Sequence, residues 1–156
     1  MTKTVYFGAG WFNKEQKKAY RQAMEAFKAN KTINWDDSYV PLDHQYRNLS
    51  VEEHPELLED KEWAIATYNG DLVGIRTTDI STFVYLPNQE DIGCGVEMGY
   101  AKGQGKYVLL IVPDELWGKP INLMSFGIAD KVIKLSELRK FNFNHLGFDF
   151  YPGQVY

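Results

Sequence analysis

The chain has 156 residues, of which 44% are apolar and 24% are charged, and its formal net charge is −4. This length predicts one domain, residues 1–156, which can bury roughly 70% of its unfolded surface without disulfides or metal ions. The absence of a basic cluster disfavours nucleic-acid binding. The single cysteine, Cys94, favours a reducing compartment. With no signal peptide and no apolar span of about 20 residues, we expect a cytoplasmic protein without membrane contact.

Strands and helices are expected to alternate in the first half of the chain. The expected elements are a strand at 3–9, a helix at 13–30, a short strand or extended segment at 38–42, and a helix at 60–78. Asn13 and Gln16 form a capping-box-like start for the first helix. The Asn69-Gly70 pair predicts a break within the second.

The second half continues the alternation. The expected elements are a strand at 79–87, a helix at 95–104, and strands at 106–113 and 130–135. Near-continuous apolar strands separated by helices predict an α/β fold, with a parallel sheet of about five strands covered by helices on both faces. The tail, residues 141–156, has no helical or strand period, but it is too aromatic to be free. We expect it to pack on the body of the protein or on a neighbouring subunit.

Ligands of open parallel sheets bind outside the carboxyl ends of the strands. One polar segment in such a place carries Gly93, Gly95 and Gly99. Their spacing differs from the dinucleotide-binding fingerprint, and acidic neighbours would repel a phosphate. The glycines therefore either permit a tight turn and close helix packing or, less favoured, form a phosphate loop.

Three carboxylates are candidates for chemistry at this edge. Glu97 is expected in the first turn of its helix, where the dipole favours an ionised nucleophile, but on the residues alone a capping role is the favoured interpretation. Asp71 and Asp91 could donate a proton to a leaving group, or could be solvated surface residues. Cys94 has no predicted histidine partner and is interpreted as a bystander thiol. No H-E-x-x-H or C-x-x-C motif occurs, so no metal site is predicted.

Several segments together resemble one known family over essentially the whole chain, in order and in spacing. They are VYFGAGWF at 5–12, SYVPLDHQY at 38–46, ATYNGDLVGI at 66–75, DIGCGVEMGYA at 91–101, GKPINLMSFG at 118–127 and the terminal VY. The chain is similar to nucleoside 2-deoxyribosyltransferases, of the lactobacillus type that accepts both purines and pyrimidines.

The resemblance implies a flavodoxin-like fold and a homohexamer built as a trimer of dimers. It also implies the transfer of a 2-deoxyribosyl group between nucleobases with retention at the anomeric carbon. The substrates would be 2-deoxyribonucleosides and free nucleobases, and no cofactor is expected.

The family's functional residues map onto named positions here. By this resemblance Glu97 is the nucleophile, Tyr6 orients it, and Asp71 and Asp91 contact the base. The expected substrate-binding residues are Phe12 and Gln45 at the pocket wall and the base, Met124 in the sugar pocket, and Asn122 and Tyr156 at the sugar hydroxyls of a neighbouring subunit's site. The sequence departs from the usual family pattern at Phe83, Cys94, Lys102 and Phe126, none of which is a candidate catalytic group.

Two alternatives to a transferase stay open. A hydrolase of the same fold would cleave nucleosides or nucleoside monophosphates to the free base. The glycine segment has no serine to bind a phosphate, which favours a neutral 5′-hydroxyl. The other alternative is a non-catalytic, flavodoxin-like binding module, which should keep its function when Glu97 is replaced by alanine.

Overall fold

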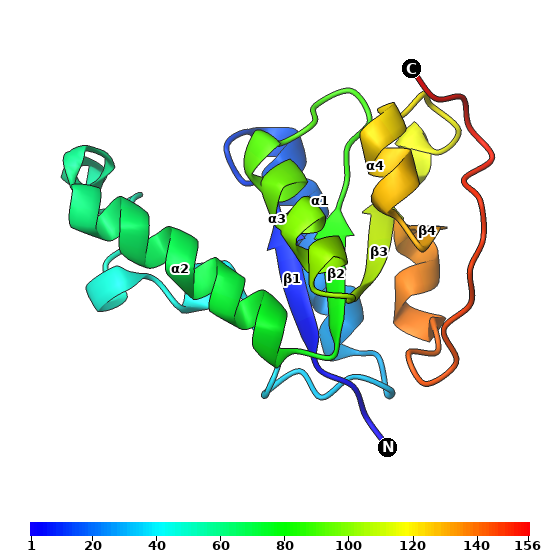
Figure 1. Cartoon of the computed structure of the whole chain (residues 1–156), viewed down its shortest axis with the longest axis horizontal. Helices are drawn as coiled ribbons and strands as arrows, with labels where there is room; N and C mark the ends of the chain where they lie inside the picture. Colours follow the sequence, from blue (N-terminus) through cyan, green and yellow to red (C-terminus); the bar gives the residue numbers. More distant parts are fainter.

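The structure is a computed structural model that describes residues 1–156. Four parallel strands form one sheet in the order β1-β2-β3-β4: Val5–Ala9, Ile80–Val84, Tyr107–Val112 and Lys131–Lys134. The α-helices are α1 (Lys14–Lys28), α2 (Lys61–Thr77), α3 (Ile92–Gly103) and α4 (Leu123–Ile128). Helices flank the sheet, so the predicted α/β class is confirmed (Figure 1). None of the helices is long and apolar enough to cross a membrane.

The two faces of the sheet have separate hydrophobic cores. On one face, α1 packs Ala23 and Phe27 against Phe7 of β1. On the other, α3 packs Met98 and Ala101 against the opposite side of the same strands. Alternate residues of a strand point to opposite faces, so Phe7 faces α1 while its neighbour Tyr6 faces the α3 side.

The expectation of about five strands is wrong, because residues 38–42 form only a single bridge. The Tyr39 N–H donates to Val5 O and the Phe7 N–H donates to Tyr39 O, both at 2.9 Å. Pro41 then begins a short 3₁₀ helix, Pro41–Asp43. Proline has no N–H to extend a ladder, so the segment leaves the edge of β1 after one pairing.

The predicted break in α2 is also wrong, since the helix runs unbroken through Asn69 and Gly70. The glycines serve packing instead. A Cβ at Gly74 would lie 2.3 Å from the Tyr39 ring, and one at Gly70 would lie 3.1 Å from the Tyr39 hydroxyl. In Figure 1, α2 extends away from the sheet and carries the segment before it outward.

Helix α3 begins earlier than expected, at Ile92, with Asp91 as its N-cap. The Asp91 carboxylate accepts the Cys94 N–H at 2.8 Å. The glycine segment is therefore helical and is not a phosphate loop. Close packing does not explain Gly95 or Gly99 either, because a Cβ at these two positions would meet nothing within 4 Å.

The C-terminal tail packs on its own chain. Phe143 and Tyr151 are buried, and Val155 forms a bridge with Ile121. Phe148 and Phe150 remain 78% and 84% exposed. The expectation that the tail is not free is thus confirmed, and part of its aromatic surface still faces outward.

Candidate active site

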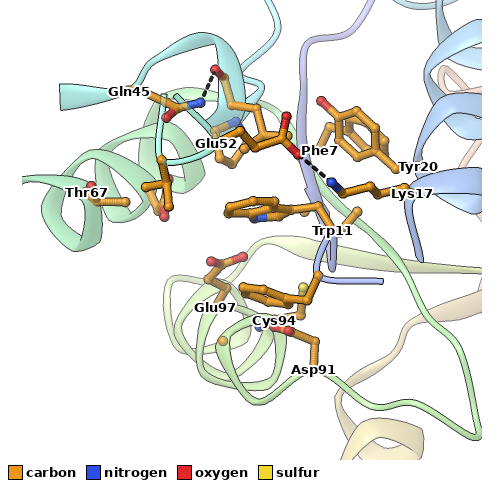
Figure 2. Close-up of a pocket in the computed structure, with 18 of the residues that line it drawn as sticks. Phe7, Trp11, Lys17, Tyr20, Gln45, Glu52, Thr67, Asp91, Cys94 and Glu97 are labelled. Atoms are coloured by element: carbon orange, nitrogen blue, oxygen red, sulfur yellow. Dashed lines mark hydrogen bonds and ion pairs between the residues drawn. The ribbon is translucent and has the colours of Figure 1, made fainter. Parts of the chain in front are cut away.

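A cavity of about 550 Å³ opens beside the carboxyl end of β1. Its walls come from the β1–α1 loop, α1, residues 41–58, α2 and the first turns of α3. In Figure 2, Glu97 and Asp91 lie on one side of Trp11, and Gln45 and Glu52 on the other. The edge of the sheet predicted from the sequence is therefore the edge beside which this cavity lies.

Five of the predicted site residues line this cavity: Phe12, Gln45, Asp71, Asp91 and Glu97. They come from a loop, a 41–58 segment and two helices, yet they face one space. The structure therefore brings together the groups expected to contact the base and to carry out the chemistry.

Glu97 lies in the second turn of α3, on the side that faces the sheet. Burial, together with the negative charge of Asp71, raises its pKa to about 8. The expectation that the helix dipole keeps Glu97 ionised is therefore wrong, because the dipole acts only within the first turn. A carboxylate that is costly to ionise in the free protein is instead a strong base and nucleophile once ionised.

Tyr6 of β1 lies below the cavity, fully buried, with its ring stacked on Tyr39 at 5.8 Å between centroids. Burial and the nearby carboxylate of Glu97 raise the Tyr6 pKa, so the phenol stays protonated. Its hydroxyl acts on Glu97 in the other direction and lowers the Glu97 pKa. In this structure the buried hydroxyl has no hydrogen-bond partner.

Glycine at position 8 lets Glu97 and β1 come close. A Cβ there would lie 2.4 Å from the Phe83 ring and 3.2 Å from Glu97 Oε2. Any side chain at this position would displace Phe83 or push the carboxylate away. Phe83, one of the departures from the family pattern, thus belongs to the support of Glu97.

The two aspartates have different environments. Asp71 is partly buried in α2, and burial raises its pKa to about 6. Asp91 uses one carboxylate oxygen to cap α3. Asp71 is therefore the carboxyl that holds a proton nearer to neutral pH, while Asp91 is fixed in place as an acceptor.

Another part of the cavity wall combines aromatic and polar side chains. Trp11 and Phe12 stack at 5.0 Å between ring centroids, and Phe12 is 70% exposed. The Gln45 amide donates to Leu42 O at 3.1 Å. Lys17 and Glu52 form an ion pair that joins α1 to the 41–58 segment. A flat aromatic ring such as a nucleobase can stack on this wall.

Sequence reasoning missed two cavity residues of α2, Trp63 and Thr67. With Asp71 they recur every four residues and so share one face of the helix. The Trp63 Nε1 and Thr67 Oγ1 atoms are buried without hydrogen-bond partners. Their spacing was a usable signal, but the supposed break at Asn69-Gly70 separated them from Asp71.

Besides the buried Tyr6, three predicted residues do not line this cavity: Asn122, Met124 and Tyr156. Asn122 caps α4 by accepting the Met124 N–H at 2.8 Å, and with Met124 it lines a second hollow of about 370 Å³. Met124 and Tyr156 are 69% and 63% exposed. None of the three lines the 550 Å³ cavity of the same chain.

Comparisons with known proteins agree with the resemblance. A family model for nucleoside 2-deoxyribosyltransferase matches residues 5–124. A nucleoside deoxyribosyltransferase of Lactobacillus leichmannii is 63% identical over 154 residues, covering 99% of this chain and 98% of that protein. One from Lactobacillus johnsonii is 61% identical over 148 residues, covering 95% of this chain and 99% of that protein.

A solved structure shares the fold. The 2-deoxyribosyltransferase of Bacillus psychrosaccharolyticus aligns with a TM-score of 0.77 at 23% identity, covering 95% of this chain and 98% of that chain. The matched family model, the curated relatives and the buried carboxylate site agree: this chain belongs to the nucleoside 2-deoxyribosyltransferase family and is an enzyme.

Proposed function

We propose that this enzyme moves a 2-deoxyribosyl group between purine and pyrimidine bases through a covalent intermediate on Glu97. The observation that carries the proposal is a buried glutamate facing a cavity of about 550 Å³ together with two further carboxyl groups. That volume lies within the range of small-molecule sites, roughly 300–1,000 Å³.

In the first half-reaction, a Glu97 oxygen attacks the anomeric carbon. The bond from that carbon to the base nitrogen breaks, and its electron pair goes to the base. A carboxylic acid protonates the leaving nitrogen, and a deoxyribosyl ester of Glu97 remains. The missing 2-hydroxyl favours this step, because the positive charge that develops on the sugar is not destabilised by an electron-withdrawing neighbour.

We assign the proton donor to Asp71, because burial raises its pKa to about 6. Asp91, fixed at the α3 N-cap, then serves as an acceptor for donors on the base. Tyr6 would orient the Glu97 carboxylate and, by crowding the 2-position, disfavour a ribose.

In the second half-reaction, a new base enters, loses its proton to the Asp71 carboxylate and attacks the same carbon. The ester bond breaks and Glu97 is released. Two inversions give overall retention, and the kinetics should be ping-pong.

We further propose a cytoplasmic homohexamer, a trimer of dimers, in which Asn122, Met124 and Tyr156 bind the sugar at a neighbouring subunit's cavity. The support is exposed apolar surface on α2, α3 and α4, at Ile65, Tyr68, Ile92, Val96 and Leu123. Contiguous exposed apolar patches typically mark interfaces. We also propose a flavodoxin-like fold. If the segment that bridges β1 at Tyr39 is counted as an edge strand, the order of strands across the sheet matches the flavodoxin-like order 2-1-3-4-5.

The test is to incubate the pure enzyme with thymidine and adenine, without phosphate, and to separate the products by chromatography. Direct transfer predicts deoxyadenosine and thymine. Thymine with free deoxyribose alone would contradict the proposal and favour a hydrolase of the same fold. Some hydrolysis beside transfer is expected, since water can intercept the ester.

A further inference from the structure

One carboxylate oxygen of Glu90 is hydrogen-bonded to three separate parts of the chain. Glu90 Oε1 accepts hydrogen bonds from the Tyr85 hydroxyl, from the Asn122 N–H at 3.2 Å and from the Tyr156 hydroxyl at 3.2 Å. Tyr85 follows β2 and is buried, Asn122 begins α4, and Tyr156 is the last residue. A carboxylate can accept several such bonds, and bonds to a charged acceptor are the stronger ones.

The backbone already brings the tail beside α4. The Tyr156 N–H donates to Ile121 O at 3.1 Å, and the Leu123 N–H donates to Tyr156 O at 2.8 Å. These bonds fix the chain of Tyr156 but leave its exposed ring free to rotate. The bond to Glu90 fixes the ring as well, and with it the direction of the terminal residue.

Glu90 also stands directly before Asp91, which lines the chain's own cavity and caps α3. Both acids line the second hollow with Asn122, but only Asp91 also lines the 550 Å³ cavity. Asp91 contributes to the chain's own site, and Glu90 holds Asn122 and Tyr156, which lie outside that site.

We propose that Glu90 is a positioning residue, which holds Asn122 and Tyr156 in the geometry that binds the sugar at a neighbouring subunit's cavity. This inference rests on the proposed function, since it uses the role proposed there for these two residues. The buried Tyr85 anchors Glu90 from the sheet side, so the support reaches the rigid core of the protein.

The first test is steady-state kinetics of Glu90→Ala, with Glu90→Gln as the conservative variant and Glu115→Ala as a control. Glu115 is an exposed glutamate that contacts only Lys18. Asn122 and Tyr156 are together called the arm. We expect Glu90→Ala to lower kcat/KM about tenfold, mainly through KM for the nucleoside, because the charged hydrogen bonds to the arm are lost. Glu90→Gln keeps an acceptor oxygen and should recover most of the loss, with the melting temperature of all three near that of the parent.

A double-variant cycle then separates positioning from general damage. Tyr156→Phe removes one of the three donors, so in the Glu90→Ala background it should add almost nothing. Additive losses, or a Glu90→Ala enzyme with the kcat/KM of Glu115→Ala, would overturn the inference. A Glu90→Gln enzyme as impaired as Glu90→Ala would do the same.

Mixed oligomers test the placement of the arm on a neighbour. Glu97→Ala subunits keep an intact arm but lack the nucleophile, and Glu90→Ala subunits keep the nucleophile. Co-assembled, they should exceed the summed activity of the separate preparations, because some sites then contain both intact parts. If the mixed oligomers had only the summed activity of the separate preparations, the inference would be overturned. Failure of the proposed function is seen separately, as full activity of Glu97→Ala alone.

Discussion

At the scale of single residues, the main feature is two carboxyl groups in one cavity whose pKa values are both raised. The pKa of Asp71 is raised to about 6 and that of Glu97 to about 8, and the charge of Asp71 contributes to the second shift. Between these values the pair binds one proton. The proposed mechanism uses the form in which Glu97 is ionised and Asp71 is protonated, which is the minor of the two singly protonated forms.

We therefore expect a bell-shaped dependence of kcat/KM on pH. The rate should rise as pH increases through about 6 and fall above about 8, because the pair then loses its last proton. Asp71→Asn should lower the rate and remove the alkaline limb, because the remaining glutamate needs only to be ionised. A flat profile for the parent enzyme between these values would contradict the assignment.

Tyr6→Phe tests the influence of the phenol on Glu97. The Tyr6 hydroxyl lowers the Glu97 pKa. Its removal should move the alkaline limb of the profile to higher pH and lower kcat by about tenfold. The check is the kcat/KM profile of the variant beside the parent, and a limb that stays in place would mean that Tyr6 acts only through packing.

The same burial predicts an effect on stability. The folded-state pKa of Glu97 is raised above its ordinary 4.5. The stability contributed by its protonated form is therefore fully present below about pH 4.5 and lost as pH rises through about 8. At pH 9 the free energy of unfolding of Glu97→Gln should exceed that of the parent by on the order of a few kcal/mol. At pH 4 the two free energies of unfolding should be nearly equal. Chemical denaturation at both pH values measures them. Glu25→Gln, at an exposed site on α1, is the matched control.

At the scale of elements, glycines decide how α2 meets the sheet. A Cβ at Gly74 would enter the Tyr39 ring, whereas one at Gly103 of α3 would meet nothing within 4 Å. Gly74→Ala should therefore destabilise the protein by about 1–3 kcal/mol through overpacking. Gly103→Ala should change the free energy of unfolding by only a few tenths of a kcal/mol in either direction. Chemical denaturation of both variants is the check, and equal stabilities would contradict the packing argument.

The sequence predicted elements whose signal is local. The apolar strand at 107–112 and the Asn13-capped helix α1 were foreseen, because periodicity and capping lie within a few residues. The error at α2 came from a contact with Tyr39, which is distant in the chain, whereas the strand at 38–42 was overestimated because Pro41 ends its pairing with β1. The Asn69-Gly70 pair predicts a break, but in the fold Gly70 and Gly74 give room for the Tyr39 ring.

In the candidate site, too, the residue types were predictable from the sequence, whereas the roles that depend on distant neighbours were not. Gly8 and Asp91 have roles that depend on a neighbour, Phe83 in one case and the α3 N-terminus in the other. Periodicity carries no information about such neighbours. Family resemblance supplied the residue types, and the fold supplied the burial that raises the Glu97 pKa.

At the scale of the whole molecule, the exposed apolar surface is the feature that the single chain does not explain. Ile65 and Val96 are 62% and 55% exposed on helices that contact each other. Ile65→Glu should place a charge in the proposed interface and shift the enzyme toward smaller species, with loss of activity. Gln22→Glu adds the same charge on α1, which covers the other face of the sheet, and should do neither. Sedimentation velocity measures both, and an unchanged size for Ile65→Glu would contradict the proposed interface.

The most direct measurement is the mass of the intact protein after brief mixing with a 2-deoxyribonucleoside and no acceptor base, followed by acid quench and peptide mapping. The account predicts a gain of one deoxyribosyl group on the peptide that carries Glu97, absent from Glu97→Ala and removed by adding a free base. An adduct on another residue, or rapid transfer with Glu97→Ala, would contradict the central claim that Glu97 is the nucleophile.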